Sequence, residues 1–321
     1  MVKEDGLVSG KPDVSIVIAS YNTRSMLESC IRSIYESTKA ITYEIICVDD
    51  SSSDGSADMV GQNFPDVRLV QNIANLGYTK SNNIGIKLAR GRYIVLLNAD
   101  TEIQSQAFDR MVTFMDQTPE AAACGPKLLN PDGSIQYCIR SFPNVLTLLA
   151  QSLGLHRLFP HNPITDRYYM TSLNYDQIIE AESIGTTCYM VGRKALDEIG
   201  LLDEVFFLYC ADLDFNKRIG LAGYKIFYLP QAEVIHYGGL SVNQNARWHL
   251  IDAHRGYRIL YDRYYAPKHG PLYNALVRLA IKMRLGLFLV RLMLGRDKRV
   301  VKGPGAPGQN SVRREWTTDT K

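Results

Sequence analysis

The stretch VSIVIASYNTRSMLESCIRSIYESTKAITYEIICVDD, residues 14–50, decides the fold class of this 321-residue chain. It opens with a short β-branched run, Val14 to Ala19, which predicts a buried strand. Apolar residues then recur at spacings of three and four from Met26 to Tyr35, which predicts a helix. A second apolar run, Tyr43 to Val48, ends on two aspartates. The stretch is therefore predicted to form a strand, a helix and a second strand.

The same alternation continues along the first half of the chain. Further strands are predicted at Val67–Gln71 and Tyr93–Leu97, and helices around Ala57–Gln62, Lys80–Leu88 and Gln106–Met115, the last approached through a polar, helix-opening Thr101-Glu102. Strands that alternate with helices at this spacing favour βαβ units and an α/β fold with a mostly parallel central sheet flanked by helices.

The second half of the chain is less regular. Pro131-Asp132-Gly133 predicts a hairpin turn. Strands are predicted at Ile184–Val191, Tyr224–Leu229 and Val234–His236, and helices at Arg193–Gly200, Leu208–Leu221 and Arg247–Tyr265. The expected layout is an N-terminal tail (1–12), two halves of one domain (13–125 and 126–245), C-terminal helices (246–295) and a basic disordered tail (296–321).

Composition narrows the class of protein. The chain is 46% hydrophobic and 21% charged, which is typical of a globular protein with one large or two small cores. A net charge of +3 gives no sign of nucleic-acid binding. None of the six cysteines forms a Cys-x-x-Cys pair, and several lie in apolar runs, so a reducing, cytoplasmic location is expected. Met1 to Lys11 has no apolar signal-peptide core.

The C-terminal region suggests contact with a surface. Leu276 to Gly295 is the longest apolar stretch, but it is interrupted by Arg278, Lys282, Arg284 and Arg291 and is no membrane span. On a helix these charges fall on two nearly opposite stripes, so the stretch is not a clean amphipathic surface helix. Packing on the domain, packing on a partner subunit in a homo-oligomer and attachment to a membrane surface all remain open.

Acidic residues gather where predicted strands end. Asn98-Ala99-Asp100 follows one strand, at the edge where open α/β sheets bind ligands, and a carboxylate there can share a hard cation with substrate phosphates. Asp49 and Asp50 end another strand. They form either a solvated turn or acceptors for a nucleobase or ribose.

Two further positions could carry chemistry. Asp212 and Asp214 lie near a helix start, where carboxylates either favour the helix dipole or act as a general base. Residues two apart do not share a helix face, so one of them is expected to point at the substrate. His236 precedes glycines, which suits either a structural histidine or a ligand beside a flexible loop.

In order and spacing, these segments resemble the family 2 inverting glycosyltransferases of GT-A fold, and most of all the bacterial rhamnosyltransferase-type branch. The resemblance extends from about Val14 to Ser241. It is carried by Val14–Asn22, Val48–Ser56, Asn72–Tyr78 with Asn82–Gly85, Gly91–Asp100, and the His-x-x-Gly-x-Ser pattern of residues 236–241.

The resemblance implies a role for each matching residue. Residues 13–125 would bind a nucleotide-diphosphate sugar, a dTDP- or UDP-sugar, and residues 126–245 the acceptor. The donor pocket would comprise Ala19, Tyr21, Asp49, Asp50, Asn75, Gly77, Asn82 and Asn98. Asp100 and His236 would hold Mg²⁺ or Mn²⁺, and Asp212 would be the catalytic base.

Two positions depart from the family pattern. Asn98 replaces the first carboxylate of the D-x-D motif, which marks the rhamnosyltransferase-like branch. Ala211 replaces the first acidic residue of the Glu-Asp acceptor motif, and Asp214 is the neighbour that could compensate for it.

The implied function is transfer of a sugar, rhamnose among the options, to a hydroxyl of a glycan or lipid-linked glycan in bacterial cell-surface polysaccharide or O-antigen synthesis. The protein would act in the cytoplasm, at the inner face of the membrane. One rival is a sugar-nucleotide nucleotidyltransferase, but Ala19–Thr23 lacks the glycine-rich, lysine-bearing loop that this activity requires. The other is a catalytically silent sugar-nucleotide-binding module, for which Ala211 is the best support.

Overall fold

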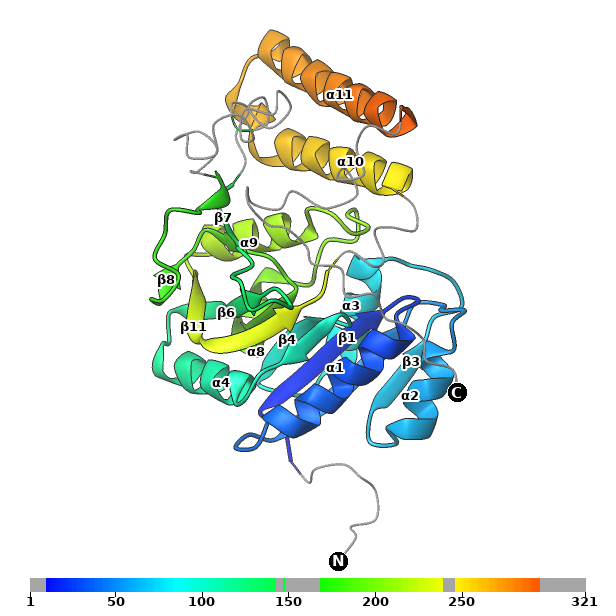
Figure 1. Ribbon diagram of the computed structural model, residues 1–321. Helices are drawn as coiled ribbons and strands as arrows, with labels where there is room; N and C mark the ends of the chain where they lie inside the picture. Colours follow the sequence, from blue (N-terminus) through cyan, green and yellow to red (C-terminus); the bar gives the residue numbers. More distant parts are fainter. Residues whose placement is uncertain (1–9, 143–146, 148–167, 239–245, 295–321) are drawn as a thin grey trace, which may run out of the picture.

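The computed structural model describes residues 10–142, 147, 168–238 and 246–294 (Figure 1). Within these residues, nine strands form one mixed sheet, in the order β3-β2-β1-β4-β10-β6-β11-β5, with β8 paired to β11. Figure 1 shows helices on both faces of this sheet and two further helices, α10 and α11, stacked beyond α9. The predicted tail 296–321 and most of the tail 1–12 lie outside the described residues.

The first half of the chain builds the parallel part of the sheet. Its strands are β1 (Val14–Ser20), β2 (Tyr43–Asp49), β3 (Arg68–Gln71) and β4 (Tyr93–Asn98), joined by helices α1 (Arg24–Ser37), α2 (Ser56–Asn63) and α3 (Tyr78–Leu88). Every residue of β1 except Ala19 is buried, because helices cover both faces. The chain reverses direction across the sheet between β3 and β4, so α1 and α3 lie on opposite faces.

The rest of the domain extends the sheet with strands that run in both directions. Its main elements are β5 (Thr101–Ile103), α4 (Ala107–Gln117), β6 (Ala121–Leu129), β10 (Cys188–Gly192), α8 (Arg193–Ile199), α9 (Ala211–Leu221) and β11 (Lys225–His236). Three short strands complete it: β7 (Ile139–Arg140), β8 (Ile179–Glu180) and β9 (Ser183–Ile184). β10 runs antiparallel to both β4 and β6, which makes the sheet mixed.

Several predicted elements differ from the structure. Thr101 and Glu102 do not open a helix; they form β5, which pairs antiparallel with the end of β11. β6 was not predicted, because its alanines, glycine and proline have low strand propensity. The predicted strand 184–191 is two strands, and the two predicted at 224–236 are one strand with an irregular register between Leu229 and Glu233.

The C-terminal helical extension is present. α10 (Ala246–Tyr264) and α11 (Pro271–Met293) are joined by a short 3-10 turn, Ala266–Lys268. The backbone N–H of Tyr209 donates to the carboxylate of Asp252 at 3.1 Å, so α10 is fixed to the segment before α9. None of the helices described in the structure has both the length and the apolar character needed to cross a membrane.

Candidate active site

The carboxyl ends of three neighbouring parallel strands form the floor of the site. In the sheet register, Ala19 of β1 lies beside Val48 of β2 and beside Asn98 of β4, and Ser20 lies beside Asp49. Ala19, Asp49 and Asn98 are thus brought to one edge, as the sequence predicts. Tyr21, which follows β1, is 38% exposed and can contact a ligand at this edge.

Asp50 holds the loop that follows β3. One carboxylate oxygen accepts from Asn72 Nδ2 and from the backbone N–H of Leu76, and the other accepts from the backbone N–H of Gly77, all at 2.8 Å. A carboxylate has about four acceptor positions, so roughly one remains for a ligand. Asp50 therefore places Asn75 and Gly77 at the site in addition to any direct contact it makes.

Two buried polar atoms of the predicted donor pocket have no partner among the described residues. Asp49 Oδ2 accepts from the backbone N–H of Ser52 at 3.0 Å, but Asp49 Oδ1 is without a hydrogen bond. Asn82 Nδ2 donates to the carbonyl of Tyr78 at 2.8 Å, and Asn82 Oδ1 is likewise unpartnered. Buried acceptors without donors are costly, and a bound ligand that donates hydrogen bonds would satisfy them.

Gly77 joins the two halves of the domain. Its φ of 87° lies in the left-handed region, and a Cβ there would come within 2.7 Å of the Phe207 ring. The backbone N–H of Thr79 also donates to the carbonyl of Phe207 at 3.2 Å. The start of α3 and the loop that leads into α9 are therefore in direct contact across the site.

Asp100 and His236 form the pair expected for a metal. β5 and β11 pair antiparallel with Thr101 opposite His236, and this register sets Asp100 Oδ1 3.4 Å from His236 Nε2. Burial acts to raise the pKa of Asp100, but the His236 side chain and the backbone N–H of Gly238 outweigh it, and the net shift is downward. The Asp100 carboxylate is therefore ionised at neutral pH.

Gln136 fixes the orientation of the His236 ring. Gln136 Nε2 donates to Asn130 Oδ1 at 3.1 Å and to the His236 carbonyl at 3.4 Å, so its Oε1 is left as the acceptor. That oxygen lies 2.6 Å from His236 Nδ1, which must then carry the proton. Nε2 is the ring nitrogen that faces Asp100, and it is the atom in position to bind a cation. A ligating histidine held through its other nitrogen is the usual arrangement at metal sites.

The donor set suits a cation that is shared with a phosphate. Within the described ranges of the chain, no group of three or more His, Cys, Asp and Glu side chains gathers to form a complete cage. One carboxylate and one imidazole would leave most coordination positions to phosphate and water. At nucleotide sites Mg²⁺ is commonly held by one or two carboxylates with phosphate and water, so Asp100 fits such a cation, and the imidazole adds a nitrogen donor that a transition-metal cation accepts more readily than Mg²⁺ does.

Asp212 is the second residue of α9 and is half-buried. Its Oδ1 accepts from the backbone N–H of Leu213 at 2.9 Å. Burial raises the pKa of Asp212, and the Leu213 hydrogen bond offsets only part of that effect. A carboxylate with a raised pKa is a stronger proton acceptor than an ordinary aspartate.

Comparison with protein families settles the class of protein. The sequence model described as glycosyl transferase family 2 matches residues 15–198, more than half of the chain. The chain belongs to glycosyl transferase family 2. The matched region covers β1 to β4 and reaches α8, and so includes the predicted donor pocket and Asp100.

Curated relatives of this family 2 protein include enzymes of cell-surface glycan synthesis. It is 28% identical over 302 residues to the N-acetylglucosaminyl-diphospho-decaprenol L-rhamnosyltransferase of Mycobacterium tuberculosis, covering 88% of this chain and 95% of the relative. It is 25% identical to an O-antigen biosynthesis protein, RfbC, of Myxococcus xanthus, covering 83% of this chain and 20% of that one. The resemblance to the rhamnosyltransferase-type branch is thereby confirmed.

Solved structures confirm the fold class. A mannosyltransferase from Pyrobaculum calidifontis, in complex with GDP-Man and Mn²⁺, matches with a TM-score of 0.52 at 15% identity, covering 91% of this chain and 83% of that one. GalNAc-T7 with UDP, GalNAc and Mn²⁺ matches with a TM-score of 0.55 at 15% identity, covering 84% of this chain and 55% of that one. At this identity the likeness shows the fold alone, which is the GT-A fold.

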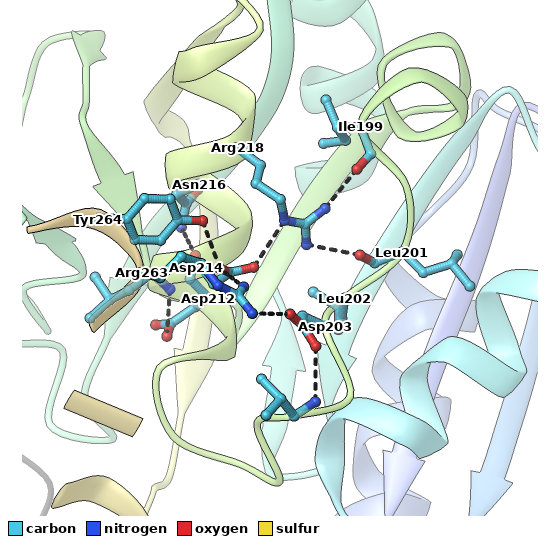
Figure 2. Close-up of polar contacts among 12 residues, drawn as sticks. Ile199, Leu201, Leu202, Asp203, Asp212, Asp214, Asn216, Arg218, Arg263 and Tyr264 are labelled. Atoms are coloured by element: carbon cyan, nitrogen blue, oxygen red, sulfur yellow. Dashed lines mark hydrogen bonds and ion pairs between the residues drawn. The ribbon is translucent and has the colours of Figure 1, made fainter. Parts of the chain in front are cut away.

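Asp214 does not replace the acidic residue missing at Ala211. Its carboxylate is fully buried and accepts from Arg218 Nε at 2.9 Å, from Arg263 Nη1 at 2.6 Å and from the Tyr264 hydroxyl at 2.7 Å (Figure 2). Those bonds tie α9 to α10 and occupy the side chain in a structural role. Asp214 is therefore not available to compensate for Ala211, and the sequence-based suggestion that it does is wrong. That Asp212 is the aspartate that points at the substrate stays a prediction.

The packing around Ala211 explains its small size. Ala211 is fully buried in an apolar cluster with Phe206, Cys210, Leu213 and Leu260. An acidic side chain at this position would be taken out of water into that cluster, which is costly.

Some parts of the site were not predicted from the sequence, and some lie outside the described residues. Gln136 was missed, although it follows the predicted Pro131-Asp132-Gly133 turn and a search along that hairpin would have reached it. The contacts of α10 were missed because they are long-range. Ser241 lies outside the described residues, as do the other residues of 143–146, 148–167 and 239–245, all of which belong to the half predicted to bind the acceptor.

Proposed function

We propose that this family 2 protein is a metal-dependent inverting glycosyltransferase that transfers a sugar from a nucleotide-diphosphate donor during cell-surface glycan assembly. One observation carries the proposal: the β5–β11 register sets Asp100 against His236 just after the end of β4, on the same sheet edge as the end of β2, which holds the unpartnered Asp49 oxygen. Sugar transfer from a nucleotide-diphosphate donor requires a diphosphate-binding site on the same edge as a nucleoside pocket.

The donor would lie across the strand ends. Tyr21 and the Ala19 backbone would contact the base, and Asp49 Oδ1 would accept a hydrogen bond from the imide of a uracil or thymine. Asp50 would act through its remaining acceptor position and by holding the loop of Asn75 and Gly77. Asn82 and Asn98 would complete the pocket. A UDP- or dTDP-sugar satisfies these groups.

Asp212 would be the catalytic base. Its raised pKa suits it to accept the proton of an acceptor hydroxyl as that oxygen attacks the anomeric carbon. A single displacement with the diphosphate leaving on the opposite side inverts the anomeric configuration.

Asp100 and His236 would hold Mg²⁺ or Mn²⁺. When bound, the cation supplies Lewis-acid neutralisation of charge on the departing diphosphate. Asn98 in place of a carboxylate leaves Asp100 as the acidic ligand, so the donor diphosphate contributes more to cation binding. Gln136 would hold the His236 ring so that Nε2 stays available.

The acceptor would be a glycan or lipid-linked glycan. Similarity to the Mycobacterium tuberculosis rhamnosyltransferase supports rhamnose as the sugar and a diphospholipid-linked acceptor. Residues 13–125 would bind the donor and residues 126–245 the acceptor, with the reaction in the cytoplasm at the inner face of the membrane.

A donor panel tests the proposal. The purified protein is incubated with Mg²⁺ or Mn²⁺ and individual dTDP- and UDP-sugars, with and without a lipid-linked acceptor, and released nucleoside diphosphate is measured. We expect acceptor-dependent release from one donor and none after chelation. Release that is absent for every donor and acceptor would favour the silent binding module, and release unaffected by chelation would contradict the metal role.

The base assignment has a separate test. Asp212→Asn should lower the rate of transfer by roughly 10²-fold or more, as expected for loss of a general base. The dissociation constant of the donor should stay nearly unchanged. Donor affinity is measured by calorimetry with the nucleoside diphosphate and Mn²⁺. If donor affinity falls as much as the rate does, Asp212 belongs to the donor pocket and the assignment is wrong.

A further inference from the structure

α11 presents a continuous apolar stripe to solvent. Leu272, Leu276, Leu279, Met283, Leu287 and Val290 follow one another at helical spacings of three and four residues, and each is more than half exposed. The opposite face of α11, where Val277 and Ile281 are buried, packs on α10 and on the 3-10 turn that joins the two helices. The stripe extends for much of a helix that is about 35 Å long.

Cations flank the stripe on both sides. Arg278 and Lys282 lie along one edge, and Arg284 and Arg291 along the other. Arg278 pairs with Asp262 at 2.8 Å, and Arg284 packs over the Tyr257 and Phe288 rings. Arg291 also lies over the Phe288 ring, but it is exposed, as is Lys282. The two charged stripes seen in the sequence therefore separate one buried apolar face from one exposed apolar face.

Charge is strongly segregated along the chain. Residues 1–245 contain 20 Lys/Arg and 28 Asp/Glu, whereas residues 246–321 contain 16 and 5. No acidic residue occurs between Asp262 and Asp297, so α11 itself has none. The small net charge of the whole chain is therefore the sum of an acidic region, residues 1–245, and a basic region, residues 246–321.

We propose that the stripe of α11 docks on the surface of an anionic lipid bilayer, with the helix parallel to the membrane plane. Apolar side chains flanked by cations match the acyl boundary and the anionic headgroups of such a surface. This inference deepens the membrane location given in the proposed function, but its evidence, the stripe and the flanking cations, does not involve the donor site.

A second copy of the chain fits the stripe less well. Pairing two α11 helices through their stripes would bring the exposed cations Lys282 and Arg291 of one copy toward those of the other, and α11 has no acidic side chain to neutralise them. Like charges across an interface oppose association, whereas anionic headgroups complement the same cations.

The exposed stripe of α11 is connected to the candidate active site through α10. α11 packs on α10, and α10 holds the segment leading into α9 through Asp252 and the Asp214 carboxylate through Arg263 and Tyr264. In Figure 1, α11 is the outermost layer on the α9 side of the sheet. Docking through α11 would therefore hold the Asp212 side of the molecule toward the lipid.

Vesicle flotation of the full-length protein tests the inference. The probes are vesicles of phosphatidylcholine alone and vesicles of phosphatidylcholine with phosphatidylglycerol, at low and high salt. We expect binding to the anionic vesicles that weakens with salt. Leu279→Gln/Met283→Gln/Leu287→Gln should reduce the bound fraction at least tenfold, and Lys282→Glu/Arg291→Glu should reduce it on anionic vesicles.

Controls make each outcome decisive. Leu221→Gln, at a leucine that is 68% exposed on α9, should float like the wild type. Circular dichroism and binding of nucleoside diphosphate should be unchanged in the triple variant, because the replaced side chains are exposed. The inference is overturned if the triple variant floats normally, or if the wild type ignores anionic vesicles and is instead a dimer that the triple variant dissociates.

Discussion

At the scale of single residues, two aspartates on α9 have opposite environments. Asp212 is half-buried with one described hydrogen bond, and its pKa is raised by burial. Asp214 is completely buried and fully engaged with Arg218, Arg263 and Tyr264. The helix turns them to different sides, so one is left for chemistry and the other stabilises the fold.

The raised pKa of Asp212 predicts the acid limb of the rate profile. The base must be unprotonated, so transfer should increase as pH rises through a pKa above the ordinary aspartate value of about 3.9. The measurement is kcat against pH at saturating donor. As a reference, Asp214→Asn should keep the same limb while lowering the free energy of unfolding. An acid limb at or below the ordinary value would contradict the predicted role of burial.

Gln136 is predicted to act on the metal through His236. Gln136→Ala frees the imidazole ring and its tautomer, and outer-shell changes of this kind typically weaken metal binding by about 10- to 100-fold. Mn²⁺ affinity in the presence of nucleoside diphosphate can be followed by paramagnetic resonance. Gln177→Ala, at an exposed glutamine, is the control. Unchanged Mn²⁺ affinity in Gln136→Ala would show that the His236 contact is irrelevant to the cation.

At the scale of elements, short strands and tight loops determine the site. The three-residue strand β5 and the end of β11 bring Asp100 to His236, although the two residues are far apart in the sequence. The loop between β3 and α3 is folded back by Asp50. Each of these elements contributes few residues, but each sets the position of a functional group.

Gly77 offers a test of the contact between α3 and the loop before α9. Gly77→Ala combines a strained positive φ with a Cβ that would overlap the Phe207 ring, so it should destabilise the protein by more than about 1 kcal/mol and weaken donor binding. Denaturant unfolding and calorimetry measure the two effects.

A matched control separates strain from overlap. Gly133 has a φ of 81° with no atom near the position of a Cβ, so Gly133→Ala carries the strain alone. Adding Phe207→Ala to Gly77→Ala should recover part of the loss. Equal effects of the two glycine substitutions would mean that the Phe207 contact contributes nothing.

At the scale of the whole molecule, α10 and α11 form a layer whose interior includes a histidine. His254 is buried, its Nδ1 lies 2.7 Å from the Leu250 carbonyl, and Arg284 Nη1 lies 3.4 Å from its Nε2. The Phe288 ring packs against it edge-on. Burial, with a smaller contribution from the Arg284 charge, lowers the pKa of His254 to about 4.

Stability should therefore depend on pH through His254. The unfolded chain binds a proton near pH 6.5 and the folded chain near pH 4, so the contribution is complete above 6.5 and is lost as pH falls toward 4. Asp212 and Asp252, whose pKa values are raised by burial, act in the opposite direction. The measurement is accordingly the difference in unfolding free energy between the wild type and His254→Gln. A difference that does not change between pH 7 and pH 4.5 would contradict the prediction.

Local sequence patterns were enough to predict the alternating strands and helices of the first half, the mostly parallel sheet and the family. Hydrophobic periodicity and turn residues specify each strand and helix locally. Right-handed crossovers then leave few ways to join these elements into a sheet. The sequence also singled out Asp100, His236 and Asp212 through motif spacing.

How these residues come together depends on long-range packing. Strand pairing in β5 and β11, the Gln136 contact, the burial of Asp214 and the choice of which α11 face is exposed depend on partners distant in sequence. Periodicity along one segment carries no information about what packs against it. The two charged stripes of α11 were visible in the sequence, but only the position of α10 distinguishes the covered face from the exposed one.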